Sequence, residues 1–136
     1  MIGRVLDSSA LVAWGRRTSP FVDATIWARA EHAGYVVPLV TTGPAVAAAL
    51  AQLPESATPI VDALLSMDVT IVDEVGRQSA PGLAALLRPR HAAYAEQGVT
   101  AASVVLAAKR RGLPVVTANP LPLTALWADV EIDLIP

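Results

Sequence analysis

The chain has 136 residues, a net charge of −2 and no cysteine, and 54% of its residues are hydrophobic against 16% that are charged. The length favours one domain over residues 1–136, and the lack of cysteine excludes disulfides, thiolate metal sites and cysteine nucleophiles. No apolar run reaches the roughly 18–20 residues of a membrane helix, and Asp7 interrupts the N-terminal apolar run too early for a signal peptide, so we expect a cytoplasmic protein without membrane association.

Short β-branched runs alternate with longer helical stretches along the chain. In chain order, the sequence predicts a strand over 3–6, helices over 8–14 and 20–33, a strand over 35–40, helices over 42–53 and 58–67, a strand over 69–72, helical material over 76–87, a helix over 100–111, a strand over 114–117, a helix over 120–127 and a strand over 130–135. Ser8 and Ser9 are expected to cap the first helix, and Thr100 is expected to cap the helix that Gly112 ends.

This order of elements predicts an α/β fold, a three-layer domain with a mostly parallel sheet of about five strands flanked by helices. The apolar, β-branched runs suit strands that are buried on both faces. Ligands of such folds bind beyond the carboxyl ends of the strands. We therefore expect a site near Asp7, after Val40, after Val72 and at residues 117–119. Flavodoxin-like and other doubly wound folds stay open at this point.

Two segments near the two ends of the chain carry recognisable motifs. Residues 5–12 form an apolar strand that delivers Asp7, followed by Ser8, Ser9 and an apolar helix. Residues 98–119 form a helix of small residues that leads through a glycine into a strand ending Thr-Ala-Asn. Both segments, and the order of strands and helices between them, resemble PIN domains, the family related to the PilT N-terminus, of the toxin–antitoxin ribonuclease type. The resemblance covers essentially the whole chain and implies a PIN-like fold.

The resemblance implies a ribonuclease in which about four carboxylates hold Mg²⁺ or Mn²⁺, and the metal activates water and neutralises the phosphate being cut. Asp7 matches the first of these acids and is the candidate catalytic and metal-binding residue. The other three positions fall on residues 41–45, on Ala101 and on Asn119, and none of them is acidic here. Asn119 still offers a carbonyl oxygen. We therefore expect no cofactor, unless a residual Mg²⁺ or Mn²⁺ site survives at Asp7 and Asn119.

Both candidate ligands have a structural alternative. Asp7 can cap the helix that follows it, and Asn119 can serve as a turn residue before a proline. Ser8, Ser9 and Thr117 are possible lining residues of the site, but serines in this position are more often helix caps than nucleophiles, and Thr117 can bond to its own backbone.

The basic residues are only weak evidence for an anionic partner, because the chain as a whole has no excess of positive charge. Arg16 and Arg17 follow the first helix near the expected pocket mouth, so they are the better candidates for contacting an anion. The run of cations at 109–111 ends a helix, where positive charge complements the helix dipole, and phosphate contact is the alternative role.

Three functions stay open. The leading hypothesis is a degenerate PIN-domain protein, a pseudoenzyme that acts by protein or RNA binding rather than by catalysis. The second is an active Mg²⁺- or Mn²⁺-dependent endoribonuclease, the toxin of a toxin–antitoxin pair, and the third is a small-molecule or nucleotide-binding module, although no Gly-rich phosphate loop is present. Trp14, Trp27 and Trp127 are expected as core or interface anchors. The resemblance implies a homo-oligomer such as a homodimer, because PIN-like toxins often pair, and it implies an antitoxin or another protein as a further partner; an apolar surface with aromatic residues is a common interface composition.

Overall fold

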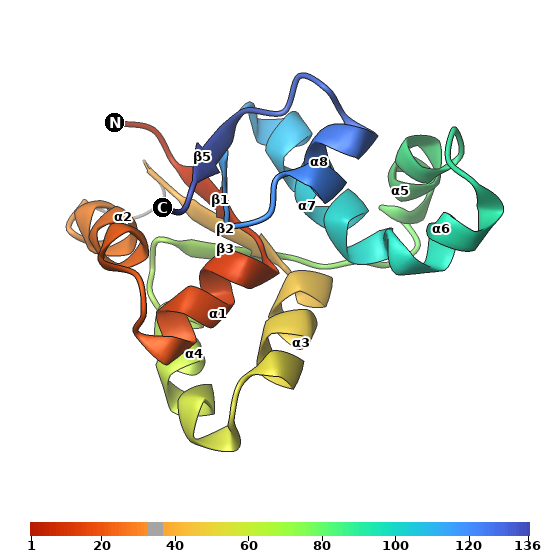
Figure 1. Cartoon of the computed structure of the whole chain (residues 1–136). Coiled ribbons are helices and arrows are strands. Elements are labelled where there is room, and N and C mark those ends of the chain that lie inside the picture. The colour runs from red at the N-terminus through yellow and green to blue at the C-terminus, as the bar shows by residue number, and fades with distance from the viewer. Residues whose placement is uncertain (33–36) are drawn as a thin grey trace.

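The computed structural model describes residues 1–32 and 37–136 and confirms the three-layer α/β fold (Figure 1). Its sheet has five strands, all parallel, in the order β3-β2-β1-β4-β5. The strands are β1 (Arg4–Leu6), β2 (Leu39–Thr42), β3 (Thr70–Asp73), β4 (Val115–Thr117) and β5 (Ile132–Leu134). The second strand was predicted over 35–40 but begins at Leu39, and residues 35 and 36 lie outside the described part of the chain.

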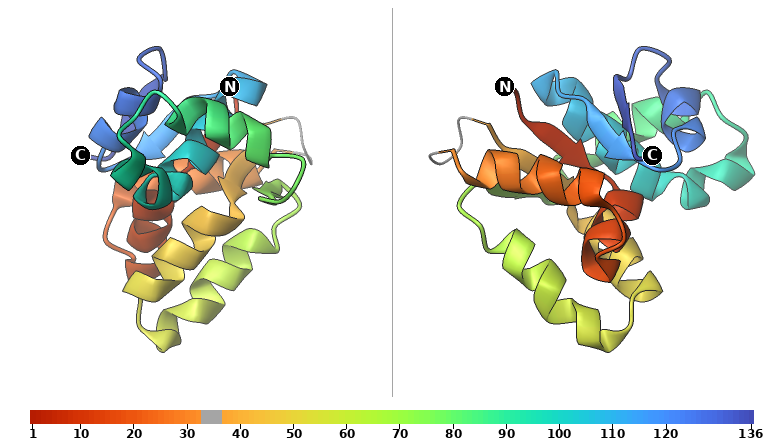
Figure 2. Two further views of the ribbon diagram at one scale, coloured as in Figure 1. Left: turned by 90° about the vertical axis from the view of Figure 1, so that its right-hand side faces the viewer. Right: turned by 60° about the vertical axis from the view of Figure 1, so that its left-hand side comes forward.

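Helices cover both faces of the sheet (Figures 1 and 2). One face carries α1 (Ser8–Arg16), α2 (Pro20–Ala30), α3 (Gly43–Gln52), a 3₁₀ turn (Glu55–Ala57) and α4 (Thr58–Leu65), and the other carries α5 (Ala80–Leu87), α6 (Ala92–Gln97), α7 (Val99–Arg111) and α8 (Leu121–Leu126). This division follows from right-handed crossovers, because the chain builds the sheet outward from β1 to β3 and then returns to add β4 and β5. The second helix was predicted to reach residue 33, which lies outside the described part; its observed end is Ala30.

The strands in the middle of the sheet form the centre of the core. Val5, Val40 and Val115 are completely buried, as expected of parallel strands covered on both faces. Helices α1 and α3 pack closely at Gly15, where an added Cβ would lie 2.6 Å from a methyl group of Leu53. No helix in the described ranges is both long and apolar enough to span a bilayer.

Side-chain caps explain where the helices on the first face begin. Asp7 caps α1, because its carboxylate accepts a hydrogen bond of 3.0 Å from a backbone N–H in the first turn. The prediction that Ser8 and Ser9 cap this helix is therefore wrong, since both lie within it. Ser19 caps α2 and Thr42 caps α3 in the same way, and each of these helices has a proline in its first turn, as predicted.

The helical region between β3 and β4 differs most from the prediction. Helix α5 begins only at Ala80, and α6 was not predicted. Helix α7 begins at Val99 directly after Gly98, so Thr100 lies inside it and does not cap it. Gly112 ends α7 in the left-handed conformation (φ 62°), as predicted.

Candidate binding site at the strand ends

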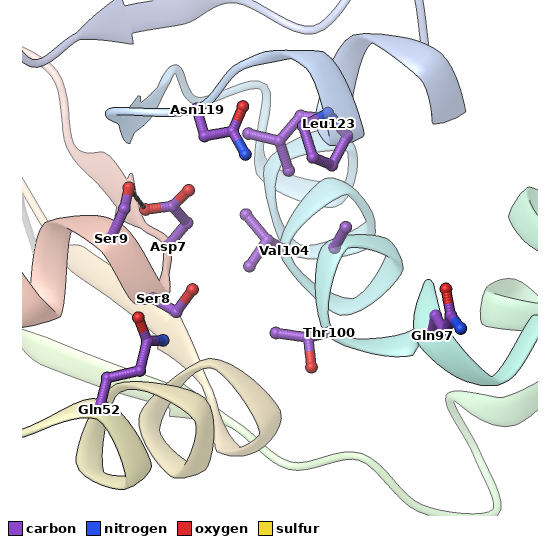
Figure 3. A pocket seen from close by; sticks show the side chains of 11 residues that line it. Asp7, Ser8, Ser9, Gln52, Gln97, Thr100, Val104, Asn119 and Leu123 are labelled. Atoms are coloured by element: carbon purple, nitrogen blue, oxygen red, sulfur yellow. Dashed lines mark hydrogen bonds between the residues drawn. The ribbon is translucent and has the colours of Figure 1, made fainter. Parts of the chain in front are cut away.

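A cavity of about 440 Å³ opens where the carboxyl ends of β1 and β4 meet helices α1, α3, α7 and α8 (Figure 3). The side chains that line it are those of Asp7, Ser8, Ser9, Gln52, Gln97, Thr100, Ala101, Val104, Asn119, Pro122 and Leu123. Its place agrees with the expectation for parallel α/β sheets, and its volume is in the range of small-ligand sites. The fold thus brings the two terminal motifs of the sequence to one cavity.

Asp7 is the one charged residue among the described residues that line this cavity. It is 8% exposed, and its Oδ1 accepts hydrogen bonds from the Ser9 hydroxyl at 2.6 Å and from the backbone N–H of Ala10 at 3.0 Å. No described residue donates to its Oδ2, which points to the Asn119 side of the cavity (Figure 3). Asp7 is therefore a helix cap with one carboxylate oxygen left for a ligand.

Ser9 and Thr117 tie the end of β1 to the end of β4. The Ser9 hydroxyl donates to Asp7 and accepts from the backbone N–H of Ala118 at 2.8 Å, while the Thr117 hydroxyl lies 3.4 Å from it. Thr117 is completely buried and accepts from the backbone N–H of Asn119 at 2.9 Å, so it supports the site from behind without lining the cavity. The Ser9 proton is engaged by a carboxylate, which fits a positioning role.

The positions at which the resemblance implies further acids lie close together but lack charge. Ala101 presents a methyl group to the cavity from α7, and the Asn119 carboxamide lies across from Asp7 (Figure 3). At the end of β2, the Thr42 hydroxyl caps α3 and lies 2.8 Å from the hydroxyl of Ser103, and both residues are buried. This neutral hydroxyl pair and the helix start at residues 43–44 occupy the region of the missing second acid.

Several lining residues were not predicted from the sequence. Gln52 ends α3, Gln97 ends α6, and both carboxamides are exposed at the rim of the cavity. Thr100, Val104 and Leu123 form walls on α7 and α8. No local pattern marks these residues, because helix packing and the break before α7 bring them to the strand ends.

The two candidate arginines have different surroundings. Arg16 belongs to the last turn of α1, donates to the backbone carbonyl of Gln52 at 3.3 Å, and lines a second cavity of about 310 Å³ next to the first. Arg17 adopts a left-handed conformation (φ 57°), lies 4.5 Å above the ring of Trp14 and forms an ion pair of 3.4 Å with Asp23. Arg17 lines neither of these two cavities.

The lining residues do not fit a two-metal centre. Such a centre needs several carboxylates to hold two cations near one phosphate, whereas this cavity offers one carboxylate and neutral amides and hydroxyls. Within residues 1–32 and 37–136, no group of three or more His, Asp or Glu side chains is placed to hold a metal ion. No catalytic step through a metal pair follows from these residues.

The cations that end α7 have separate roles. Arg111 forms a bidentate pair with Asp73 at the end of β3, with both contacts at 2.6 Å, and this hydrogen bonding raises the pKa of Arg111. Lys109 lies 5.6 Å above the ring of Trp127. Arg110 lines a third cavity together with Arg77, away from Asp7.

The tryptophans divide between core and surface. Trp14 is 2% exposed, and its indole N–H donates to the backbone carbonyl of Ile60 at 3.0 Å. Trp27 is 47% exposed, and its ring lies 5.9 Å from that of Trp14. Trp127 is partly buried. Trp14 is thus a core anchor, while Trp27 is available on the surface of α2.

Comparisons with known proteins support the fold. No protein-family model and no curated protein matches the sequence. The crystal structure of PAE2754 from Pyrobaculum aerophilum is similar to this chain, with a TM-score of 0.57 and 21% sequence identity, over 98% of this chain and 84% of that one. At this identity the likeness shows a shared fold and carries no activity, ligand or partner to this chain.

Proposed function

We propose that this chain is a degenerate PIN-domain protein that acts by binding protein or RNA and does not cut RNA. The observation that carries the proposal is the strand-end cavity itself, in which Asp7, Ala101 and Asn119 lie together and only Asp7 is charged. The sequence resemblance supplies the PIN assignment, and the meeting of its two motifs at one cavity supports it. A cytoplasmic location is part of the proposal, on the sequence grounds given above.

Self-association is the second part of the proposal. Trp27 on α2 is 47% exposed and lies beside the buried Trp14, and large exposed aromatic side chains are enriched at protein interfaces. The proposal is a homo-oligomer, such as a homodimer, with an antitoxin-like protein as a further partner. Equilibrium sedimentation of the wild type and of Trp27→Ala tests it, and a monomeric wild type would contradict it.

A metal-dependent endoribonuclease of the toxin type is the alternative. One observation favours it: the Oδ2 atom of Asp7 faces the cavity opposite the Asn119 carboxamide, where it can contribute one bond to a Mg²⁺ or Mn²⁺ ion (Figure 3). A single ion held by one carboxylate and water would have to supply all of the activity.

An RNA cleavage assay separates the two functions. The wild type, Asp7→Asn and Ala101→Asp/Asn119→Asp are purified identically and incubated with single-stranded RNA in Mg²⁺ or Mn²⁺. We expect equal background cleavage by the wild type and Asp7→Asn, because a contaminating ribonuclease would be the same in both. Metal-dependent cleavage that the wild type shows and Asp7→Asn lacks would overturn the proposal. The third variant tests whether carboxylates alone restore activity to this scaffold.

A further inference from the structure

The third cavity lies beyond the carboxyl end of the edge strand β3. Its volume is about 580 Å³, and the residues that line it are Glu74, Gly76, Arg77, Gln78, Ser79 and Arg110. All of them except Arg110 belong to the segment that joins β3 to α5, and Arg110 belongs to the last turn of α7. A site after Val72 was expected from the sequence, and this segment contributes no residue to the lining of the Asp7 cavity. We call the third cavity the β3–α5 cavity.

Hydrogen bonds fix the shape of the segment that forms this cavity. Ser79 is 6% exposed, and its hydroxyl accepts from the backbone N–H of Gly76 at 2.9 Å and donates to the Gly76 carbonyl at 3.1 Å. The backbone N–H of Ala80 donates to the same carbonyl at 3.0 Å. The bidentate pair of Asp73 and Arg111 joins the end of β3 to the end of α7 directly beside the segment. The cavity is therefore formed before any ligand binds, as most small-molecule sites are.

The positive charge of the β3–α5 cavity has no partner within the described part of the chain. Arg77 and Arg110 are both exposed, and neither forms an ion pair with a described residue. Glu74 is the one acid among the described lining residues. Asp73 cannot offset the two arginines, because Arg111 binds both of its carboxylate oxygens. Two guanidinium groups thus face one carboxylate in a protein whose net charge is −2.

The absence of a side chain at Gly82 lets Arg110 lie against α5, which packs beside α7 (Figure 1). A Cβ at Gly82 would lie 3.2 Å from a methyl group of Leu106 and 3.9 Å from a terminal guanidinium nitrogen of Arg110. The guanidinium therefore lies at the first turn of α5, where the helix dipole is positive. A cation is unfavourable at this end of a helix, and an anion bound beside it is stabilised by both the cation and the dipole.

We propose that the β3–α5 cavity binds a small phosphorylated molecule, with its phosphate monoester at Arg77 and Arg110. Arginine presents a planar fork of N–H donors that matches phosphate oxygens. A phosphate monoester carries close to two negative charges at neutral pH, which two guanidinium groups match. A phosphodiester carries one charge per phosphate, so a nucleic-acid strand is the poorer match.

The rest of the cavity suits the organic part of such a molecule. Its volume is in the range of small-ligand sites and leaves room beyond the phosphate. The Gln78 carboxamide offers both donors and an acceptor to hydroxyl groups of the ligand. This inference goes beyond the proposed function, because Asp7 does not line the β3–α5 cavity.

The experiment is isothermal titration calorimetry of glycerol 3-phosphate into the wild type, at low salt and in EDTA. We expect saturable binding that Arg77→Ala and Arg110→Ala each weaken about tenfold or more, since each variant removes charge-assisted hydrogen bonds. Arg110→Lys keeps the charge but loses the fork, so it should lose part of this affinity. Arg88→Ala is the matched control, because it removes an exposed arginine that lines a different cavity, and it should leave the affinity unchanged.

Glu74→Gln tests the charge of the ligand by the sign of its effect on inorganic phosphate, the second probe. The variant removes the one acid among the described lining residues, so phosphate should bind several-fold more tightly. Weaker binding of phosphate by this variant would contradict an anion site.

Succinate and a short single-stranded RNA are the competing probes. The inference would be overturned by the absence of saturable glycerol 3-phosphate binding at millimolar concentrations, by an equal loss of affinity in Arg88→Ala, or by equal affinity for succinate. RNA binding that needs both arginines, without binding of glycerol 3-phosphate, would also overturn it. Each of these results leaves the proposed function standing, because that function is tested by Asp7→Asn and by metal-dependent cleavage at the other cavity.

Discussion

Two aspartates at the carboxyl ends of strands in the same sheet have different surroundings. Asp73 ends the edge strand β3, and Arg111 binds both of its carboxylate oxygens at 2.6 Å. Asp7 follows the central strand β1, and its Oδ1 receives two uncharged donors while its Oδ2 faces a cavity. A carboxylate at a strand end thus becomes part of a candidate site only where the helices leave a cavity and no cation neutralises it.

The same comparison shows what the strand-end cavity has and what it lacks. At β3, the arginine that ends α7 makes the carboxylate a structural anchor between helix and sheet. At β1, one of the two carboxylate oxygens of Asp7 caps α1. The remaining oxygen is a single hydrogen-bond acceptor, which is enough to orient a ligand but not to hold two metal ions.

The largest expected effect is a gain of metal affinity at Asp7. In Ala101→Asp/Asn119→Asp, two carboxylates are added to the cavity that Asp7 lines. Each adds an oxygen ligand and a negative charge, so we expect Mn²⁺ affinity to rise about tenfold or more per carboxylate. Isothermal titration calorimetry of the wild type and of this variant measures the Mn²⁺ affinity.

Ala101→Asn in the wild-type background is the matched control, since it adds similar volume and an oxygen but no charge. It should leave Mn²⁺ affinity unchanged. An equal gain in this control would show that the space, and not the charge, limits metal binding.

The next largest effect concerns the cap of α1. Asp7→Ala removes the acceptor for the N–H of Ala10 and for the hydroxyl of Ser9, so we expect it to lower the free energy of unfolding by about 1–2 kcal/mol. Asp7→Asn keeps an acceptor at this place, so we expect it to lower the free energy of unfolding by only a few tenths of the loss in Asp7→Ala. Urea unfolding of both variants measures these losses. If both variants lost the same free energy of unfolding, the negative charge of Asp7, rather than its capping hydrogen bonds, would stabilise the helix.

The smallest expected effect is the coupling between Asp73 and Arg111. Both side chains are partly exposed, at 21% and 28%, so solvent screens their attraction. A double-mutant cycle with Asp73→Ala and Arg111→Ala should give a coupling energy of about 1 kcal/mol that falls as salt is added. A coupling energy near zero at low salt would mean that the bidentate pair orients α7 against β3 but does not stabilise the folded protein.

Much of the fold could be predicted from the sequence, because parallel strands and capped helices leave local signals. The apolar runs around Val5, Val40 and Val115 lie in β1, β2 and β4, and the Ser-Pro and Thr-Gly-Pro signals mark the starts of α2 and α3. The start of α7 was predicted at Thr100, one residue after its observed start at Val99, whereas α6 (Ala92–Gln97) was not predicted, because six residues give too short a pattern to indicate a helix. The capping role of Asp7 was recognised as an alternative, but its geometry required the structure.

The candidate site could be predicted only in part. The terminal motifs located Asp7 and Asn119, and the structure places both at one cavity. Gln52 and Gln97 carry no local signal, because only the packing of α3 and α6 in the folded domain brings them to the cavity. The pairing of Asp73 with Arg111 joins residues 38 positions apart in the chain, and nothing in either segment alone indicates it.

Calorimetric titration of Mn²⁺ into the wild type and into Asp7→Asn tests the central claim most directly. Asp7→Asn keeps the helix cap while replacing the one carboxylate oxygen that faces the cavity. The account predicts no saturable binding below millimolar metal in either protein. Saturable micromolar binding to the wild type that Asp7→Asn abolishes would contradict it and establish a working metal site at the end of β1.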